Sequence, residues 1–237
     1  MRLHIVETGE PPAPLKSRYG DYRTMFERVI SQHAPGVAFT STAIYEGDAL
    51  PGPSDYDGVI ITGSPAGVYE GHDWIAPAEE FVRRAADAGK PQIGICFGHQ
   101  LMAQAFGGVV EKSDKGWGVG VHQYDVFQTR PWMTQTTQKI RCTVSHQDQV
   151  IEAPKGALTL AGSEFCPLGA LSYAQGPAIS FQMHPEFDHA FAEALMRLRK
   201  DRIPGETVSE GISSLTGRTD RDLISQWMAS FLMNGEG

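Results

Sequence analysis

The segment PQIGICFGHQLMAQAFGG, residues 91–108, constrains the fold of this chain more than any other part of its sequence. A short apolar run leads into Cys96, and glycines stand two residues before and two residues after it, at Gly94 and Gly98. A buried strand that only needed to pack would have no use for these glycines. The pattern predicts a strand, a sharp turn centred on Cys96, and a helix that ends at a Gly-Gly pair.

The G-x-C-x-G pattern is typical of a nucleophile elbow. Such a turn holds the sulfur of Cys96 at the carboxyl edge of a sheet and at a helix N-terminus, where unpaired N–H groups and the helix dipole favour a thiolate. The amide of Phe97 is then positioned to help hold an oxyanion. The alternative is a strand-end cysteine whose glycines serve only a tight turn. Cys142 and Cys166 have no comparable setting, so we expect them to be inert.

Apolar strands alternate with amphipathic helices through the first half of the chain, which indicates parallel β-α-β units. We expect strands at 3–8, 37–45, 57–64 and 91–95, and helices at 21–33, 73–90 and 97–108.

The later half changes character. Residues 116–127, 138–147, 156–163 and 177–184 are successive strand candidates with little helix between them, and two helices, 188–202 and 220–233, follow on either side of a Gly/Ser/Thr-rich link. The fold class we predict is α/β: a mostly parallel central sheet flanked by helices, a mixed or antiparallel β addition and a helical C-terminal extension. We assign 1–190 to one domain and expect 191–237 to pack on it.

A cysteine nucleophile needs a base and a group that orients the base. Two segments offer both at a spacing of two: SHQDQV, with His146 and Asp148, and MHPEF, with His184 and Glu186. Spacing alone leaves the two pairs equal, because alternate residues of an extended segment share a face. A buried-strand pattern leading into the second pair, and the restriction that Pro185 places on its neighbour, favour His184.

Two further features bear on the site. His99 lies one helical turn beyond Cys96, which favours packing or capping over catalysis. The loop ITGSPAGVYEG, residues 61–71, follows an apolar strand and is rich in glycine and proline, as a backbone approaching a ligand must be. The N–H groups around Gly63 and Ser64 could complete an oxyanion hole with Phe97, although, for the loop taken alone, a simple turn is the better explanation because Gly-Pro loops are common.

Composition excludes several classes of function. The net charge of −8 argues against a general nucleic-acid or anionic-membrane surface. No apolar run approaches the roughly 18 residues of a membrane helix. Three cysteines without a C-x-x-C pair suit neither a disulfide framework nor a zinc site, and the histidines do not combine with carboxylates at metal-ligand spacings. We expect a cytoplasmic protein without a metal.

Taken in order, the loop TGSPAG, the elbow GICFGHQ and the segment HPEF resemble the class I, triad-type glutamine amidotransferase domain over roughly residues 55–190. The sequence is most similar to the stand-alone branch, like the amidotransferase part of GMP synthetase. One departure is Ser64-Pro65 after Gly63, where the family often has a second glycine. The resemblance implies the following roles: Cys96 as nucleophile, His184 as base and acid, Glu186 as its orienting group, Gly63, Ser64 and Phe97 around the oxyanion, and Gln100, Ser145 and His146 in the glutamine pocket.

The implied reaction is hydrolysis of the side-chain amide of glutamine through a γ-glutamyl thioester, with no metal or organic cofactor. The resemblance also implies a separate synthetase or other ammonia acceptor as a partner, since no synthetase domain follows HPEF. Stand-alone relatives include γ-glutamyl peptide hydrolases, so a γ-glutamyl peptide or amine is the alternative substrate. A catalytically silent binding module is a further alternative, and a redox sensor built on Cys96 a weaker one, because neither other cysteine is an evident resolving partner.

Overall fold

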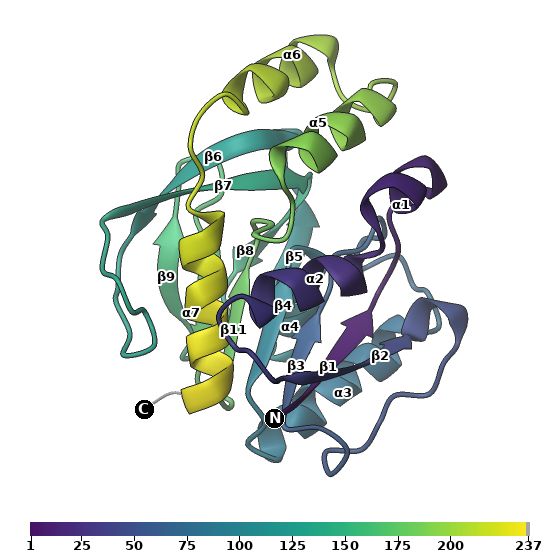
Figure 1. The fold of residues 1–237 in the computed structure, drawn as a ribbon, viewed down its shortest axis with the longest axis vertical. Helices are drawn as coiled ribbons and strands as arrows, with labels where there is room; N and C mark the ends of the chain where they lie inside the picture. The colour runs from purple at the N-terminus through teal and green to yellow at the C-terminus, as the bar shows by residue number, and fades with distance from the viewer. Residues whose placement is uncertain (236–237) are drawn as a thin grey trace.

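A nine-stranded sheet forms the centre of the molecule in the computed structural model, which describes residues 1–235 (Figure 1). Its strand order is β2-β1-β3-β4-β11-β10-β9-β6-β7. The strands are β1 (Arg2–Glu7), β2 (Ala38–Ala43), β3 (Gly58–Ile61), β4 (Gln92–Ile95), β6 (Gly118–Val126), β7 (Lys139–His146), β9 (Leu158–Gly162), β10 (Ala170–Tyr173) and β11 (Ala178–Phe181).

The sheet has a parallel and an antiparallel part. Strands β2, β1, β3, β4 and β11 pair in parallel, whereas β10, β9, β6 and β7 continue the sheet through antiparallel pairings. The predicted fold class, with a parallel centre and an antiparallel addition, is confirmed. Strand β10 and a separate two-stranded sheet of β5 (Val109–Lys112) and β8 (Asp148–Glu152) were not predicted.

Helices cover both faces of the sheet. Those described are α1 (Ala13–Tyr19), α2 (Tyr22–Ser31), α3 (Ile75–Asp87), α4 (Phe97–Ala105), α5 (His189–Leu198), α6 (Gly205–Ser214) and α7 (Arg221–Asn234), with a 3₁₀ turn at Ile44–Glu46. Helices α2 and α7 contact each other and cross in front of the sheet in Figure 1, while α3 and α4 pack together in a second core cluster with β3. The result is a three-layer arrangement.

Helix α2 illustrates how the sequence builds these layers. Asp21 caps its N-terminus by accepting a hydrogen bond from the amide of Thr24 at 2.8 Å. The apolar residues at spacings of three and four, including Phe26, Val29 and Ile30, are buried against the sheet. The strands and helices predicted for the first half of the chain therefore form, whereas helix α1 was not predicted.

The C-terminal segment differs from the prediction in one respect. The Gly/Ser/Thr-rich link contains helix α6, which packs on β6. Three small residues near its C-terminal end, Gly211, Ser213 and Ser214, weaken the apolar periodicity by which a helix is recognised in a sequence. Burial of Val208 and Gly211 against the sheet stabilises the helix. Helix α7 buries its apolar stripe in the same core as α2.

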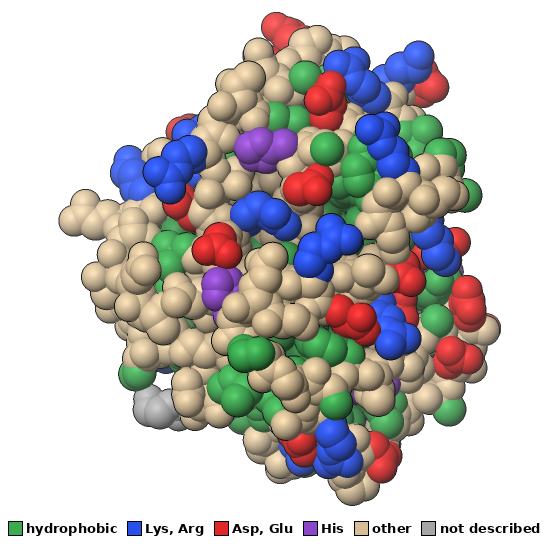
Figure 2. All heavy atoms as spheres, in the orientation of Figure 1, with side chains coloured by type: hydrophobic (Ala, Val, Ile, Leu, Met, Phe, Trp, Pro, Cys, Tyr) green, Lys and Arg blue, Asp and Glu red, His purple; other side chains and the backbone are tan. Residues whose placement is uncertain are grey.

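The charged side chains on the face seen in Figure 2 are of both signs and interspersed. No helix within residues 1–235 is long and apolar enough to cross a membrane.

Candidate functional site

Cys96 lies in the turn between β4 and α4, as predicted. Its φ of 53° and ψ of −100° make it the one non-glycine residue with positive φ in the described part of the chain. Such a conformation costs about 1–3 kcal/mol and persists only where the surroundings impose it. Here the amide of Cys96 donates to the carbonyl of Phe181 at 2.8 Å, and its carbonyl accepts from the amide of Gln100 at 3.1 Å.

The two glycines of the elbow are required by close backbone approach. A Cβ atom on Gly94 would lie 2.3 Å from the carbonyl oxygen of Gly98, and one on Gly98 would lie 2.4 Å from that of Ile61. Both distances are far below van der Waals contact. The glycines therefore allow helix α4 to start directly against β3 and β4, with Cys96 at the edge of the sheet.

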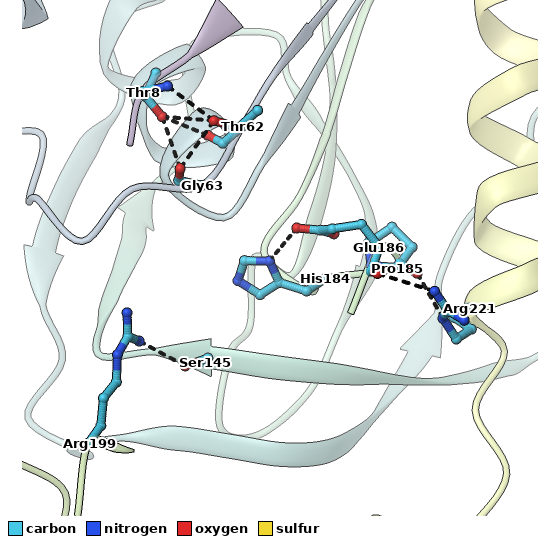
Figure 3. A network of polar contacts seen from close by, with 9 residues as sticks. All are labelled: Thr8, Thr62, Gly63, Ser145, His184, Pro185, Glu186, Arg199 and Arg221. Carbon is cyan, nitrogen blue, oxygen red and sulfur yellow. Dashed lines mark hydrogen bonds and ion pairs between the residues drawn. The ribbon is translucent and has the colours of Figure 1, made fainter. Parts of the chain in front are cut away.

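His184 follows β11, whose carboxyl end lies at the same edge as those of β3 and β4. Its Nδ1 lies 2.7 Å from Oε1 of Glu186, and both side chains are almost fully buried (Figure 3). The amide of His184 donates to the carbonyl of Thr143 at 2.8 Å, and its ring stacks on Phe187 with centroids 4.0 Å apart. These contacts hold the imidazole in one orientation.

The surroundings of His184 favour its charged form. Burial alone lowers its pKa, but electrostatic interactions and hydrogen bonds with Glu186 and Cys96 raise the pKa to about 10. The imidazole is therefore protonated at neutral pH and carries a proton beside the sulfur.

The rival pair does not form a carboxylate–imidazole contact. Nδ1 of His146 donates to the main-chain carbonyl of Asp148 at 3.1 Å, while the carboxylate of Asp148 accepts from the hydroxyl of Tyr69. Burial lowers the pKa of His146 to about 3, so its ring is neutral. His99 packs in the core, with Nδ1 2.7 Å from Oγ of Ser180.

The loop after β3 brings Gly63 against the other two groups. A Cβ atom on Gly63 would lie 3.2 Å from Cε1 of His184 and 3.7 Å from Cβ of Cys96. The carbonyl oxygen of Gly63 accepts from the hydroxyls of Thr8, at 3.2 Å, and Thr62, at 3.1 Å (Figure 3). Because a trans peptide is planar, the amide of Ser64 points away from these hydroxyls.

Phe97 begins α4, which has no side-chain N-cap. The amides of the first helical turn have no intrahelical acceptor, so the N–H of Phe97, next to the sulfur of Cys96, is suited to an anionic oxygen. The predicted oxyanion residues thus lie beside the predicted nucleophile.

A cleft of about 110 Å³ opens beside Cys96. Its walls include the three predicted pocket residues, Gln100, Ser145 and His146, and also Ser64 of the predicted oxyanion set. Nε2 of Gln100 donates to the main-chain carbonyl of Asp148 at 2.9 Å and to Oε1 of Gln182 at 3.1 Å, so this amide also holds the 145–148 segment in position. Lys112, Arg199 and Arg202 bring positive charge to the same cleft.

Two arginines near the site were not predicted. Arg199, at the end of α5, donates from Nη1 to Oγ of Ser145 at 3.1 Å. Arg221, in the first turn of α7, donates to the main-chain carbonyls of Pro185 at 3.0 Å and Glu186 at 3.2 Å (Figure 3). Nothing in the sequence distinguishes these two from the other basic residues of the C-terminal helices. Within residues 1–235, no group of three or more His, Cys, Asp or Glu side chains could hold a metal ion.

Several known proteins are similar to this chain. The family model described as glutamine amidotransferase class-I matches residues 36–197. Gamma-glutamyl peptidase 4 of Arabidopsis thaliana is 29% identical over 181 residues, which cover 73% of this chain and 70% of that protein. One of the subunits of the glutamine-hydrolyzing GMP synthase of Archaeoglobus fulgidus is 32% identical over 136 residues, covering 57% of this chain and 69% of that protein.

The fold recurs in a crystal structure of a glutamine amidotransferase from Thermotoga maritima. The TM-score is 0.78 at 17% sequence identity, with 98% of this chain and 96% of that chain covered. At this identity the similarity concerns the fold alone.

Proposed function

The chain belongs to the class-I glutamine amidotransferase family, and from this premise we propose that it hydrolyses a γ-glutamyl amide, most simply glutamine, through a thioester on Cys96. The observation that carries the proposal is the contact of a buried His184 with Glu186 at 2.7 Å on one side and with Cys96 on the other. A nucleophile, a base and an orienting carboxylate in this order form the arrangement that acyl transfer requires.

In the first half of the proposed reaction, the sulfur of Cys96 attacks the side-chain carbonyl carbon of the γ-glutamyl group. The C=O electron pair moves onto oxygen, and the amides of Phe97 and Ser64 stabilise the resulting oxyanion. When the tetrahedral intermediate collapses, the C–N bond breaks and His184 gives its proton to the departing nitrogen. Ammonia or an amine leaves, and the γ-glutamyl group remains on the sulfur as a thioester.

In the second half, His184 accepts a proton from water, and the hydroxide adds to the thioester carbonyl. The C–S bond breaks, and glutamate leaves while Cys96 returns to its starting state. Glu186 holds the ring through Nδ1 and stabilises its positive charge in both halves. Each oxyanion donor contributes on the order of 3 kcal/mol to such reactions.

The α-amino and α-carboxylate groups of the substrate are proposed to lie in the cleft formed by Gln100, Ser145 and His146. A γ-glutamyl peptide or amine is the second candidate substrate, supported by the similarity to a protein named gamma-glutamyl peptidase. The similarity to part of a GMP synthase supports a partner that is a separate ammonia-accepting protein. The three cysteines are unpaired, consistent with a reducing compartment such as the cytoplasm.

The experiment is glutamate release by the purified protein from glutamine and from γ-glutamyl peptides, with Cys96→Ala and His184→Gln as variants. Release that both variants abolish supports the proposal, and the preferred substrate separates its two forms. Equal release by Cys96→Ala on every substrate would contradict the thioester mechanism. Binding of γ-glutamyl compounds without turnover would favour the silent module.

A further inference from the structure

Two hollows meet at Cys96, and they differ in which catalytic group they contain. The larger, of about 110 Å³, includes Gln100 and Asp148, whereas the smaller, of about 10 Å³, includes His184 together with both polar and apolar side chains. Because the proposed proton donor to the leaving nitrogen is His184, the smaller hollow is on the leaving-group side of the sulfur. The larger hollow then receives the glutamyl end of the substrate.

Arg199 lines both hollows. Its guanidinium donates to the hydroxyl of Ser145, and no Asp or Glu of residues 1–235 forms an ion pair with it. Two residues earlier on the same helix, Arg197 pairs with Glu193 at 2.7 Å. A guanidinium has five N–H donors in a fork that matches a carboxylate, so most of the donors of Arg199 lack a partner among the described residues.

The surroundings of Arg199 favour the binding of an anion. Tyr22, Phe187 and Leu195 line the smaller hollow with it. Burial lowers the pKa of the Arg199 guanidinium, as expected of a partly buried cation without an acidic partner. A carboxylate bound in such a site makes charge-assisted, bidentate hydrogen bonds, which are stronger than those between neutral groups.

We propose that Arg199 binds a carboxylate on the leaving group, so that the preferred substrate is a γ-glutamyl-amino acid or peptide rather than glutamine. In a γ-glutamyl-amino acid the carboxylate is carried by the carbon bonded to the scissile nitrogen, and this nitrogen must lie within reach of His184. Glutamine and simple γ-glutamyl amines have no carboxylate there. The inference rests on the proposed function, because it assumes that Cys96 and His184 perform the cleavage.

The test compares γ-glutamyl-alanine with γ-glutamyl-alaninamide, which differ only in the leaving-group carboxylate, and includes glutamine. We expect the wild type to show a kcat/KM about 10- to 100-fold higher for the acid than for the amide, the usual range for loss of a hydrogen bond to a charged group. Arg199→Gln should bring this ratio close to one, chiefly by lowering the rate with the acid. Arg199→Lys should restore part of the ratio, and the matched control Arg197→Gln should leave it unchanged.

Other outcomes identify which step of the reasoning is wrong. A wild type that does not distinguish the acid from the amide, or an Arg199→Gln variant that loses activity equally on all three substrates, would overturn the inference. The second result would assign Arg199 to the glutamyl α-carboxylate or to a general structural role. Absence of Cys96-dependent release from all three substrates would overturn the proposed function, and this inference with it.

Discussion

Arg221 donates from Nε to the main-chain carbonyl of Pro185 at 3.0 Å, so a helix near the C-terminus holds the peptide that joins the proposed base to its orienting carboxylate. Asp220, one residue earlier, accepts from the amide of Arg141 at 2.8 Å and ties the same helix end to β7. Helix α7 therefore does more than complete the core. It restrains two segments of the candidate site.

Replacing Arg221 by alanine should lower kcat about 10-fold or more with little change in KM, because the His184–Glu186 segment would lose two hydrogen bonds that orient it. Removal of these bonds to main-chain carbonyls should also cost about 1–3 kcal/mol of stability. Steady-state kinetics and urea unfolding measure the two effects, and Arg221→Lys should recover part of both. Arg218→Ala, at an exposed position, is the control. A normal kcat and pH profile in a destabilised Arg221→Ala would limit the residue to a structural role.

The protonation of His184 predicts the pH dependence of acylation. Its pKa is raised to about 10 in part by Glu186, so the proton needed by the leaving group is present at neutral pH and is lost as pH rises through that value. Glu186→Gln should move the alkaline limb of kcat/KM to lower pH. The measurement is kcat/KM on a γ-glutamyl amide between pH 6 and about 10.5, with Glu193→Gln, on the exposed face of α5, as control. An alkaline limb at the same pH in Glu186→Gln would refute the assignment.

The hydroxyl of Thr8 should influence the reaction although it does not touch the substrate. It lies within hydrogen-bond distance of the carbonyls of Thr62 and Gly63, and these contacts orient the peptide whose N–H is the proposed oxyanion donor. Thr8→Val should lower kcat by about 10-fold, less than the loss of a whole oxyanion donor, while KM changes little. Thr216→Val, which removes an exposed hydroxyl on another loop, should not alter either constant. Equal losses in both variants would show that the effect is not specific to the loop.

The elbow should not tolerate a side chain at Gly94. The clash of a Cβ atom with the carbonyl of Gly98 has no flexible group to absorb it, so Gly94→Ala should destabilise the fold by about 3 kcal/mol. Gly205→Ala, at the start of α6 with no atom within 4 Å of the added group, should change stability by less than about 1 kcal/mol. Chemical denaturation of both variants tests the contrast. Similar values for the two would mean that the elbow can relax.

The three cysteines should differ sharply in reactivity. Burial raises the pKa of the Cys142 thiol well above its usual range and that of Cys166 to about 12. Cys96, beside a protonated His184, should therefore be the site that iodoacetamide modifies first at pH 7.5. Peptide mass spectrometry over time identifies the modified residue, and Cys96→Ala should remain almost unlabelled over the same period. Modification of Cys142 at a comparable rate would contradict this order.

The helices and strands with strong apolar periodicity were predictable, because their own residues specify both the type of element and the face that is buried. The strand–turn–helix around Cys96 and the apolar stripe of α7 are examples, since one face of each must be buried whatever the partner is. Helix α6 and strand β10 were missed, because their composition is weak and their burial depends on neighbours. The small β5–β8 sheet was missed for the same reason. Its two strands are separated by 35 residues, and only tertiary contact makes them a pair.

The candidate site divides in the same way. The order of motifs along the sequence indicated Cys96, His184 and Glu186. The signals were local: two glycines flank Cys96, and a buried-strand pattern and Pro185 flank His184. The same reasoning left His146 and His184 equal on spacing, because spacing cannot say which carboxylate turns toward which ring. The structure separates them: one ring faces a carboxylate and the other a main-chain carbonyl. The contributions of Arg199 and Arg221 were beyond prediction.

The sequence by itself determined the alternation of strands and helices in the first half of the chain, the elbow and the order of the catalytic candidates, because each depends on interactions between residues near one another in the chain. Only the tertiary structure decided what surrounds them. In the strand order, β10, β9 and β6 separate β7 from β11, the strand that leads into His184. Even so, the carbonyl of Thr143 on β7 accepts a hydrogen bond from the amide of His184. Helices α5 and α7 then bring Arg199 and Arg221 to the same edge. Contacts between residues so far apart in sequence depend on how the whole chain closes, which no local pattern records.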